Sequence, residues 1–366
     1  MSRARFEVDV PTRDEWAALW RESETATFFH SPEWAELWSR FDPATQSVPE
    51  RLRFSDGRQA LLPLCFERRF GGLLGCFTAS PQATFGGWIA RDPVDDAQAD
   101  ALLEHLLERG SSSLVWRMNP YDSVAFDAGQ RRGLWCRADH THAIELSPGA
   151  DALAKKFKNG YRSDIRKALK TGRISVEPAT SVDEWRAYYR VYQETLGRWG
   201  HQLSEGYPWE LFELLARLDS PFVKLWLARY DGAIVSGELC LYARRHVVSW
   251  HAATLQDYLR SHVAKVQILH VIQDACARGY RWFDFNPSAG LEGVRTFKES
   301  FDAQPLPAPL VYVDAPVKRL ARSVAARLKV PYAELELVPL AALLAPGAAA
   351  RPANDQALPE PHRHSA

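Results

Sequence analysis

Cationic side chains gather in one segment near the middle of the sequence. Residues 151–173 contain eight lysines and arginines against two carboxylates. Apolar residues recur there at every fourth position: Leu153, Phe157, Tyr161, Ile165 and Leu169. This spacing predicts a helix with one buried face, and it puts Arg162, Arg166 and Arg173 on another face. The segment is predicted either to bind the phosphates of tRNA, CoA or a sugar diphosphate, or to be an ordinary solvated helix face.

One carboxylate interrupts an apolar strand pattern. Asp284 lies between Phe283 and Phe285, and alternation along a buried strand directs it toward a cleft between central strands. Burial there raises the pKa of the carboxyl group, as a general base acting near neutral pH requires. The alternative is a structural carboxylate that accepts backbone hydrogen bonds. Because no Ser-His-Asp order or nucleophile elbow is present, we predict direct attack without a covalent enzyme intermediate.

A second group of polar residues lies in and after the strand pattern around residue 250. His251, Tyr258 and Arg260 are candidates for substrate contacts, since a histidine exchanges protons near neutral pH. A histidine in the core or at a sheet edge is the alternative. His140 and His142 alternate on one strand, but no carboxylate or cysteine nearby completes a ligand set, so we predict no metal site.

These residues belong to an ordered series of elements. A hairpin is predicted at Asp231-Gly232, and a helix end at Gly279. The second half is predicted to contain strand 174–177, helices 181–196 and 209–218, strands 222–230, 233–242 and 246–254, helix 263–278, strand 282–285, helix 293–301 and strand 310–313.

The first half has nearly the same order. It includes a capping box at Thr12 and Glu15, and a second hairpin signal at Asp56-Gly57. The two Asp-Gly pairs lie 175 residues apart, and Asn119-Pro120 precedes Asn286-Pro287 by 167 residues. Two landmarks at nearly one offset predict an internal duplication.

The order of elements resembles the GNAT acyltransferase fold, and four stretches resemble its FemAB-like branch, which has two tandem GNAT-like domains. They are Phe28–Trp34, Tyr161–Ala168 with Gly172 after it, Gly279–Phe285 and Phe297–Phe301. The resemblance implies an α/β fold with mixed sheets. It also implies domains at 1–146 and 147–313. The residue pattern adds an amphipathic helix and a disordered tail at 314–366.

The FemAB-like family includes peptidoglycan-precursor aminoacyltransferases that use aminoacyl-tRNA, and BioF2-like acetyltransferases. The resemblance therefore implies an enzyme that transfers an acyl or aminoacyl group to an amine. The donor would be acyl-CoA or aminoacyl-tRNA, with no permanently bound cofactor, and the acceptor an envelope precursor, a polysaccharide unit or a small amine. Residues 260–265, at the place of the GNAT pyrophosphate loop, contain no glycine, and Leu37-Trp38 stands where peptidoglycan members have a lysine.

Site residues follow from the same resemblance. Lys298 matches a family lysine implicated in donor binding or in stabilising transition-state charge; the alternative is a surface lysine beside Glu299. With Asp284 it forms the predicted catalytic pair. The predicted substrate contacts are Arg162, Arg166, Trp34, His251, Tyr258, Arg260 and Asn286.

Composition excludes several classes of protein. The 366 residues are 46% apolar and 25% charged, which excludes wholesale disorder. Forty-five basic and forty-five acidic residues give a net charge of zero, which argues against a protein whose whole surface binds nucleic acid. An odd five cysteines without a CxxC spacing argue against a zinc knuckle or a disulfide framework. With no apolar N-terminal segment, we expect a cytoplasmic protein.

The C-terminal region carries one further prediction. Residues 315–329 have the pattern of a basic amphipathic helix, which would contact an anionic membrane surface or dock on the body of the protein. From Pro346 onward the composition predicts disorder. The alternative to an enzyme is a non-catalytic binding protein, in which a pair of degenerate GNAT domains binds an anionic polymer or a nucleotide ligand.

Overall fold

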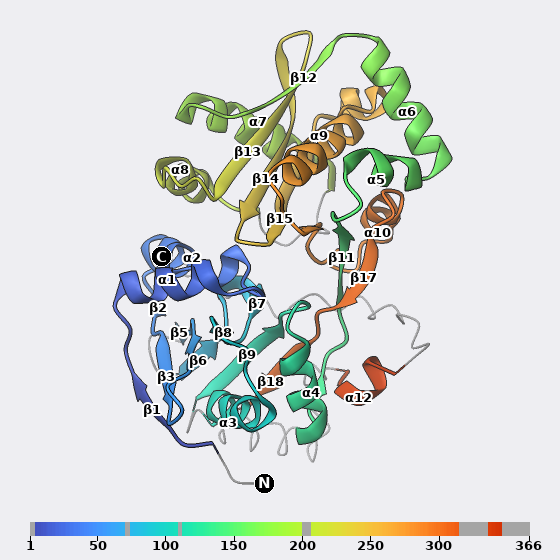
Figure 1. Cartoon of the computed structure of the whole chain (residues 1–366). Coiled ribbons are helices and arrows are strands. Elements are labelled where there is room, and N and C mark those ends of the chain that lie inside the picture. The colour runs from blue at the N-terminus through green and yellow to red at the C-terminus, as the bar shows by residue number, and fades with distance from the viewer. Residues whose placement is uncertain (1–3, 70–73, 109–111, 200–205, 315–335, 346–366) are drawn as a thin grey trace, which may run out of the picture. The chain divides into compact units, whose positions relative to one another are not determined.

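The computed structural model describes residues 4–69, 74–108, 112–199, 206–314 and 336–345 (Figure 1). The chain divides into two compact units. Unit 1 takes its described residues from 1–141, 243–246 and 306–349, and unit 2 takes them from 142–242 and 247–305. The predicted helix at 315–329 and the predicted disordered tail lie outside the described residues. Among those described, no helix is both long and apolar enough to cross a bilayer.

Unit 1 is built on two sheets. The first has the strand order β1-β3-β4-β8, and the second has the order β18-β9-β6-β5-β2, with β7 also pairing with β9. Asp56-Gly57 closes the β3–β4 hairpin as predicted, with Gly57 at φ +89°, a conformation that glycine adopts without steric cost. The strands are β1 Phe6–Asp9, β2 Thr45–Ser47, β3 Glu50–Phe54, β4 Gln59–Leu62, β5 Cys65–Arg69, β6 Leu74–Thr78, β7 Phe85–Gly86, β8 Ile89–Ala90, β9 Ser113–Met118, β18 Leu310–Val313, and the separate pair β10 Trp135–Cys136 with β19 Val338–Pro339.

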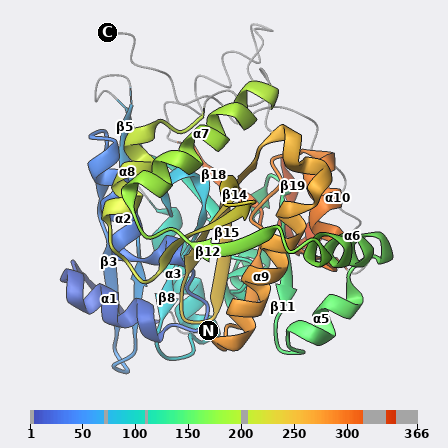
Figure 2. The ribbon, with the colours of Figure 1, turned by 90° about the horizontal axis from the view of Figure 1, so that it is seen from above.

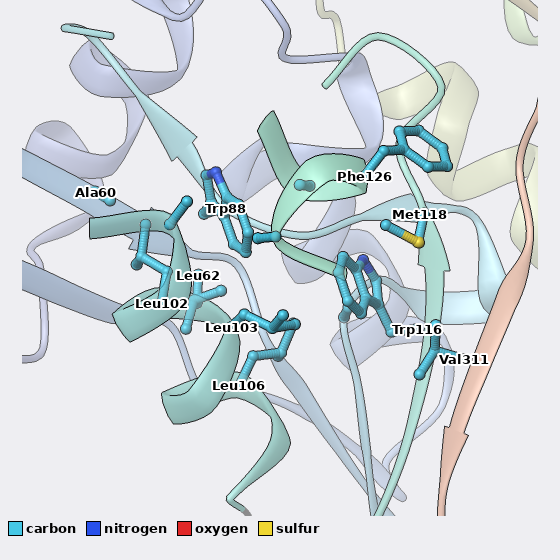
Figure 3. Packing of buried hydrophobic residues seen from close by; sticks show 14 of the residues in the cluster. Ala60, Leu62, Trp88, Leu102, Leu103, Leu106, Trp116, Met118, Phe126 and Val311 are labelled. Atoms are coloured by element: carbon cyan, nitrogen blue, oxygen red, sulfur yellow. The ribbon is translucent and has the colours of Figure 1, made fainter. Parts of the chain in front are cut away.

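Helices pack against these sheets and bury their apolar faces. Leu102, Leu103 and Leu106 on α3 follow helical spacing, and they meet Trp88 and Trp116 in the core of unit 1 (Figure 3). Each fully buried leucine contributes about 1.5–3 kcal/mol to folding. The helices are α1 Arg13–Glu22, α2 Pro32–Phe41, α3 Asp96–Leu107, α4 Ser123–Arg132 and α12 Leu340–Leu343, with 3-10 turns at Phe28–His30 and Pro81–Ala83.

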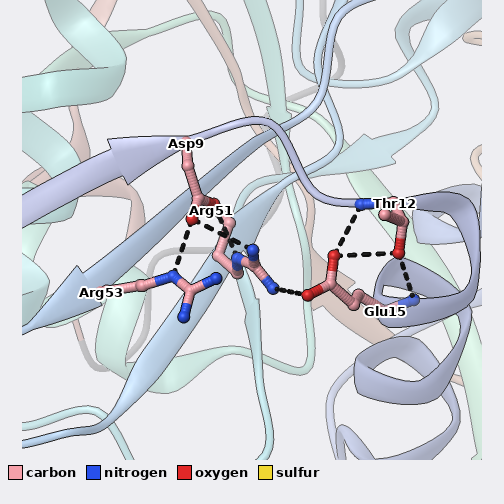
Figure 4. Close-up of polar contacts among 5 residues, drawn as sticks. All are labelled: Asp9, Thr12, Glu15, Arg51 and Arg53. Carbon is pink, nitrogen blue, oxygen red and sulfur yellow. Dashed lines mark hydrogen bonds and ion pairs between the residues drawn. The ribbon is translucent and has the colours of Figure 1, made fainter.

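An ion network ties the first strands of unit 1 to α1. The predicted capping box is present, with Thr12 and Glu15 bonding to each other at the start of α1. The buried Arg51 guanidinium binds Asp9 Oδ1 through Nε and Glu15 Oε1 through Nη1, both at 2.7 Å (Figure 4). Arg53 also binds Asp9. Arg51 and the Thr12 cap lower the pKa of Glu15 to about 2, so this network stays charged through mild acid.

Unit 2 is built on one sheet with the strand order β12-β13-β14-β15-β16-β11-β17. Asp231-Gly232 closes the β13–β14 hairpin as predicted, with both residues at positive φ. The side chains of β14 alternate between two covering layers: Gly237 lies under Tyr188 of α7, whereas Cys240 joins the apolar cluster that contains α9. The strands are β11 His140–Glu145, β12 Ile174–Pro178, β13 Val223–Tyr230, β14 Ala233–Tyr242, β15 His246–Thr254, β16 Trp282–Asp284 and β17 Gln304–Pro307.

The helices of unit 2 differ from the prediction in one respect. The cationic segment forms two helices, because Phe157 adopts an extended ψ of 146° and the Lys158 N–H donates to the Ser300 carbonyl. Leu169, predicted to be buried, is 51% exposed. Figure 2 shows α6 beside α9. The helices are α5 Ala150–Lys156, α6 Asn159–Lys170, α7 Val182–Trp199, α8 Trp209–Arg217, α9 Val263–Ala277 and α10 Glu292–Glu299, with a 3-10 turn at Gln256–Ser261.

Candidate functional site

Three of the predicted residues meet where β16 ends. Asp284 is the last residue of β16, and its Oδ1 accepts a hydrogen bond of 2.7 Å from the Asn286 N–H. Asn286 adopts a left-handed φ of 60°, which asparagine tolerates better than most residues. Its carbonyl oxygen accepts a hydrogen bond of 2.6 Å from Lys298 Nζ. The turn after β16 therefore connects the predicted catalytic pair through one residue's backbone.

Lys298 lies in the last turn of α10, with its side chain directed into unit 2. It is only 5% exposed, so the alternative interpretation as a surface lysine is wrong. Phe297, the residue before it, stacks with Tyr161 and Phe301 and so anchors α10 against α6. A buried ammonium requires compensating partners, because desolvation without them costs several kcal/mol.

Glu238 is a buried carboxylate that the sequence pattern did not single out. It lies on β14 and is 4% exposed, and its Oε1 accepts a hydrogen bond from Ser249 Oγ on β15. Burial raises the pKa of Glu238 to about 7, although the Ser249 hydrogen bond and the positive charge of Lys298 both lower it. A signal was present in the sequence, because Glu238 is the one charged residue between Ala233 and Tyr242.

A β-bulge in β15 separates two polar side chains of that strand. Cys240 faces Ser249 and Leu239 faces His251 across the β14–β15 pair, so Trp250 is an extra residue. Ser249 and His251 would share one face of a regular strand. The bulge puts them on opposite faces, with Ser249 beside Glu238.

His251 packs among the aromatic side chains of α7 and α8. Its Nδ1 lies 2.6 Å from Tyr188 Oη, and its ring lies 4.3 Å from the ring of Tyr192. Burial lowers the pKa of His251 to about 3, and burial followed by the nearby Glu238 charge raises that of Tyr188. The hydroxyl therefore donates to a neutral imidazole. The predicted substrate contact of His251 stays a prediction.

The predicted phosphate-binding arginines have different surroundings. Arg162 bonds to the Lys155 carbonyl at 3.0 Å and to Asn159, so it closes the end of α5. Arg166 is exposed, and no described residue pairs with its guanidinium. Neighbouring Asp164 binds Lys265 Nζ at 2.7 Å near the start of α9.

The remaining predicted contacts are scattered. Tyr258 stacks on Tyr230 with ring centroids 5.3 Å apart, and Arg260 is exposed on the turn before α9. Trp34 is fully buried in unit 1 against Phe29, and its predicted substrate contact stays a prediction.

Asp284 is fully buried too. Its hydrogen bond to the turn favours the structural interpretation, and its role as a base stays a prediction. Within the described residues, no three His, Cys, Asp or Glu side chains gather into a group that could hold a metal ion.

Residues 155–299 match the family model described as acetyltransferase (GNAT) domain. This part of the chain therefore has the sequence pattern of a GNAT domain. It contains Glu238, Asp284 and Lys298, the polar side chains described above. No curated protein matches the sequence.

Solved structures extend the likeness over most of the chain. FemX superposes with a TM-score of 0.69 at 13% identity, over 87% of this chain and 99% of FemX. L-PGS from Bacillus licheniformis has a TM-score of 0.55 at 14% identity, over 88% of this chain and 99% of that one. The C-terminal DUF2156 domain of an Agrobacterium fabrum protein, a putative lysylphosphatidylglycerol synthetase, has a TM-score of 0.52 at 15% identity, over 87% and 98%. At these identities the likeness shows the fold, which is the FemAB-like arrangement that the sequence predicted.

Proposed function

We propose that this protein transfers an acyl or aminoacyl group from a phosphate-bearing donor to an amine by direct attack. The buried Lys298 supports the proposal. Its ammonium is anchored to the Asn286 carbonyl inside the GNAT domain, and a fixed cation of this kind stabilises a developing oxyanion or holds a donor phosphate. Such electrostatic stabilisation is often the largest single contribution to acyl transfer.

Aminoacyl-tRNA is the donor that we propose, in preference to acyl-CoA. An exposed cationic surface supports this choice, because tRNA offers many phosphates to bind it. None of the side chains of this surface forms an ion pair with a described residue. The cationic surface consists of Lys155, Lys156, Lys158, Arg166, Lys167 and Lys170.

The start of α9 gives a second reason. Helix N-termini commonly hold diphosphates, and glycines let the backbone approach them. Here the helix follows His262, which has a φ of 60°, and Asp164 binds Lys265 and lies 3.5 Å from His262. A resident carboxylate at this place would repel the diphosphate of CoA. For the acceptor, the resemblance to peptidoglycan-precursor enzymes supports an envelope-precursor amine.

The experiment is a binding titration with mixed tRNA and with CoA over a series of salt concentrations. We expect tRNA binding that weakens steeply with salt and no binding of CoA. The triple variant R166A/K167A/K170A should have a shallower salt slope, by about one for each phosphate that it no longer binds. Arg217→Ala is the matched control, because Arg217 is an exposed arginine of the same unit that pairs with Glu213 on α8. Salt-independent binding, or preferential binding of CoA, would contradict the choice of donor.

The non-catalytic alternative shares this binding surface. It differs in turnover, so a radiolabelled aminoacyl-tRNA mixture incubated with primary amines discriminates between the two functions. Transfer that depends on the protein supports the enzyme, whereas tight binding without transfer supports the binding module.

A further inference from the structure

We propose that Glu238 is the general base of the GNAT domain, the group that takes the proton from the attacking amine. This assignment rests on the proposed acyl transfer and concerns a residue that the sequence pattern did not single out. Glu238 replaces Asp284 in that role.

The two carboxylate oxygens of Glu238 have different surroundings. Oε1 accepts the hydrogen bond from Ser249 Oγ, whereas no described residue donates a hydrogen bond to Oε2. Oε2 is not one of the described side-chain oxygens that are both completely buried and unpartnered, so this oxygen keeps some access to solvent. Oε2 therefore retains the lone pairs that a base needs.

Charged and titratable groups reach Glu238 from several elements. The Lys298 ammonium acts on it from α10 and the Ser249 hydroxyl from β15, whereas Tyr188 of α7 lies over the opposite face of β14 and interacts with its charge only electrostatically. Cys240 is the titratable neighbour on the same strand, and its thiol is buried and protonated because burial raises its pKa. The cation that acts on Glu238 is thus the one proposed to meet the oxyanion, so base and oxyanion stabiliser lie in one buried region.

Asp284 is less suited to exchange protons. That side chain is completely buried, and its Oδ1 accepts the backbone N–H that shapes the turn carrying the Asn286 carbonyl. Protonating Asp284 during each cycle would weaken the turn that positions Lys298. Glu238 can gain and lose a proton while Ser249 keeps it in place, because a hydroxyl can hydrogen-bond to either form of the carboxyl group.

The proposed step balances in atoms and charge. The amine nitrogen attacks the carbonyl carbon of the donor ester and forms the new C–N bond, while Lys298 faces the oxyanion. Glu238 takes one proton from that nitrogen. The ester C–O bond then breaks, and the leaving ribose hydroxyl receives the proton from the Glu238 carboxylic acid, so the base is regenerated and no further reactant is consumed.

The test is the pH profile of kcat/KM between pH 5 and 9, with tRNA charged with 14C-labelled amino acids and Nα-acetyl-lysine amide as the amine. For the wild type we expect an acidic limb with a midpoint near 7, where Glu238 loses its proton. Glu238→Gln should lower kcat roughly 10²–10⁴-fold, the range for losing an acid–base residue, and should remove this limb. Binding of the tRNA should be unchanged.

Ser249→Ala is the second variant. It removes a hydrogen bond that favours the charged carboxylate, so the acidic limb should move to higher pH. A merely structural role for Glu238 would leave the position of the limb where it is in the wild type.

Failure of the base assignment and failure of the proposed function give different results. If the wild type transfers nothing to the amine although it binds tRNA, the proposed function fails and the base assignment fails with it. If the wild type is active but Glu238→Gln keeps both its rate and its acidic limb, only the base assignment is overturned.

Discussion

Replacing Glu238 with glutamine should change how the stability of the protein depends on pH. The folded protein holds the pKa of Glu238 at about 7, against 4.5 for the unfolded chain, because burial disfavours the charge. A carboxyl group whose pKa is raised by folding stabilises the protein fully at pH values below its pKa in the unfolded chain. This stabilisation is lost as the pH rises through its pKa in the folded protein. A difference of about 2.5 pKa units corresponds to about 3 kcal/mol.

The glutamine side chain of the E238Q variant carries no charge at any pH, so the variant does not lose this contribution. We therefore expect the free energies of unfolding of wild type and E238Q to be similar near pH 4, and the variant to be more stable by up to about 3 kcal/mol above pH 7. Urea denaturation at a series of pH values, followed by tryptophan fluorescence, measures the difference, in which the other titrating groups cancel. A difference that stays constant from pH 4 to 8 would refute the reasoning.

Three other substitutions probe the proposed role of Lys298 and the interactions that stabilise each unit. Lys298→Met should lower turnover roughly 10²–10³-fold with donor affinity nearly unchanged if the charge acts in the transition state. Lower affinity with unchanged kcat would instead indicate donor binding. Gly237→Ala should lower the free energy of unfolding by about 1–3 kcal/mol in chemical denaturation, because its Cβ would lie 2.2 Å from Tyr188 Cδ2. Gly293→Ala, with nothing within 4 Å, is the control and should stabilise by about 0.5–1 kcal/mol. Arg51→Met should lower the free energy of unfolding by about 1 kcal/mol at pH 7. The loss should be smaller below pH 2, where acid neutralises its carboxylate partners, and equal losses at both pH values would contradict this.

Much of the fold could be predicted because its signals are local. The Thr12 capping box and the two Asp-Gly hairpins each depend on residues only a few positions apart, and the structure confirms them. The break between α5 and α6 could not be predicted in the same way. It depends on the Lys158 N–H pairing with the carbonyl of Ser300, far along the chain, instead of with its own helix.

The site was predictable in part. Asp284 was singled out by strand alternation and Lys298 by the family resemblance, and the structure brings both into hydrogen-bond contact with the backbone of Asn286. The sequence could not show that Ser249 and His251 lie on opposite faces of β15. Regular alternation would put both on one face, and the bulge moves them to opposite faces. Trp34 is completely buried, and by residue type alone an aromatic residue that packs a core cannot be distinguished from one that binds a ligand.

The contact that anchors Lys298 is made by a peptide carbonyl, and this has a consequence for mutational scanning. Any residue that accepts a φ of 60° at position 286 can present the same oxygen, so Asn286→Gly should keep Lys298 in place while it deletes the amide side chain. β-Branched residues should displace this carbonyl, because a positive φ is sterically unfavourable for them. Selection at position 286 would then act on the conformation of the main chain. A scan would record Asn286→Gly as tolerated and Asn286→Val as destabilising, although both substitutions remove the same amide group.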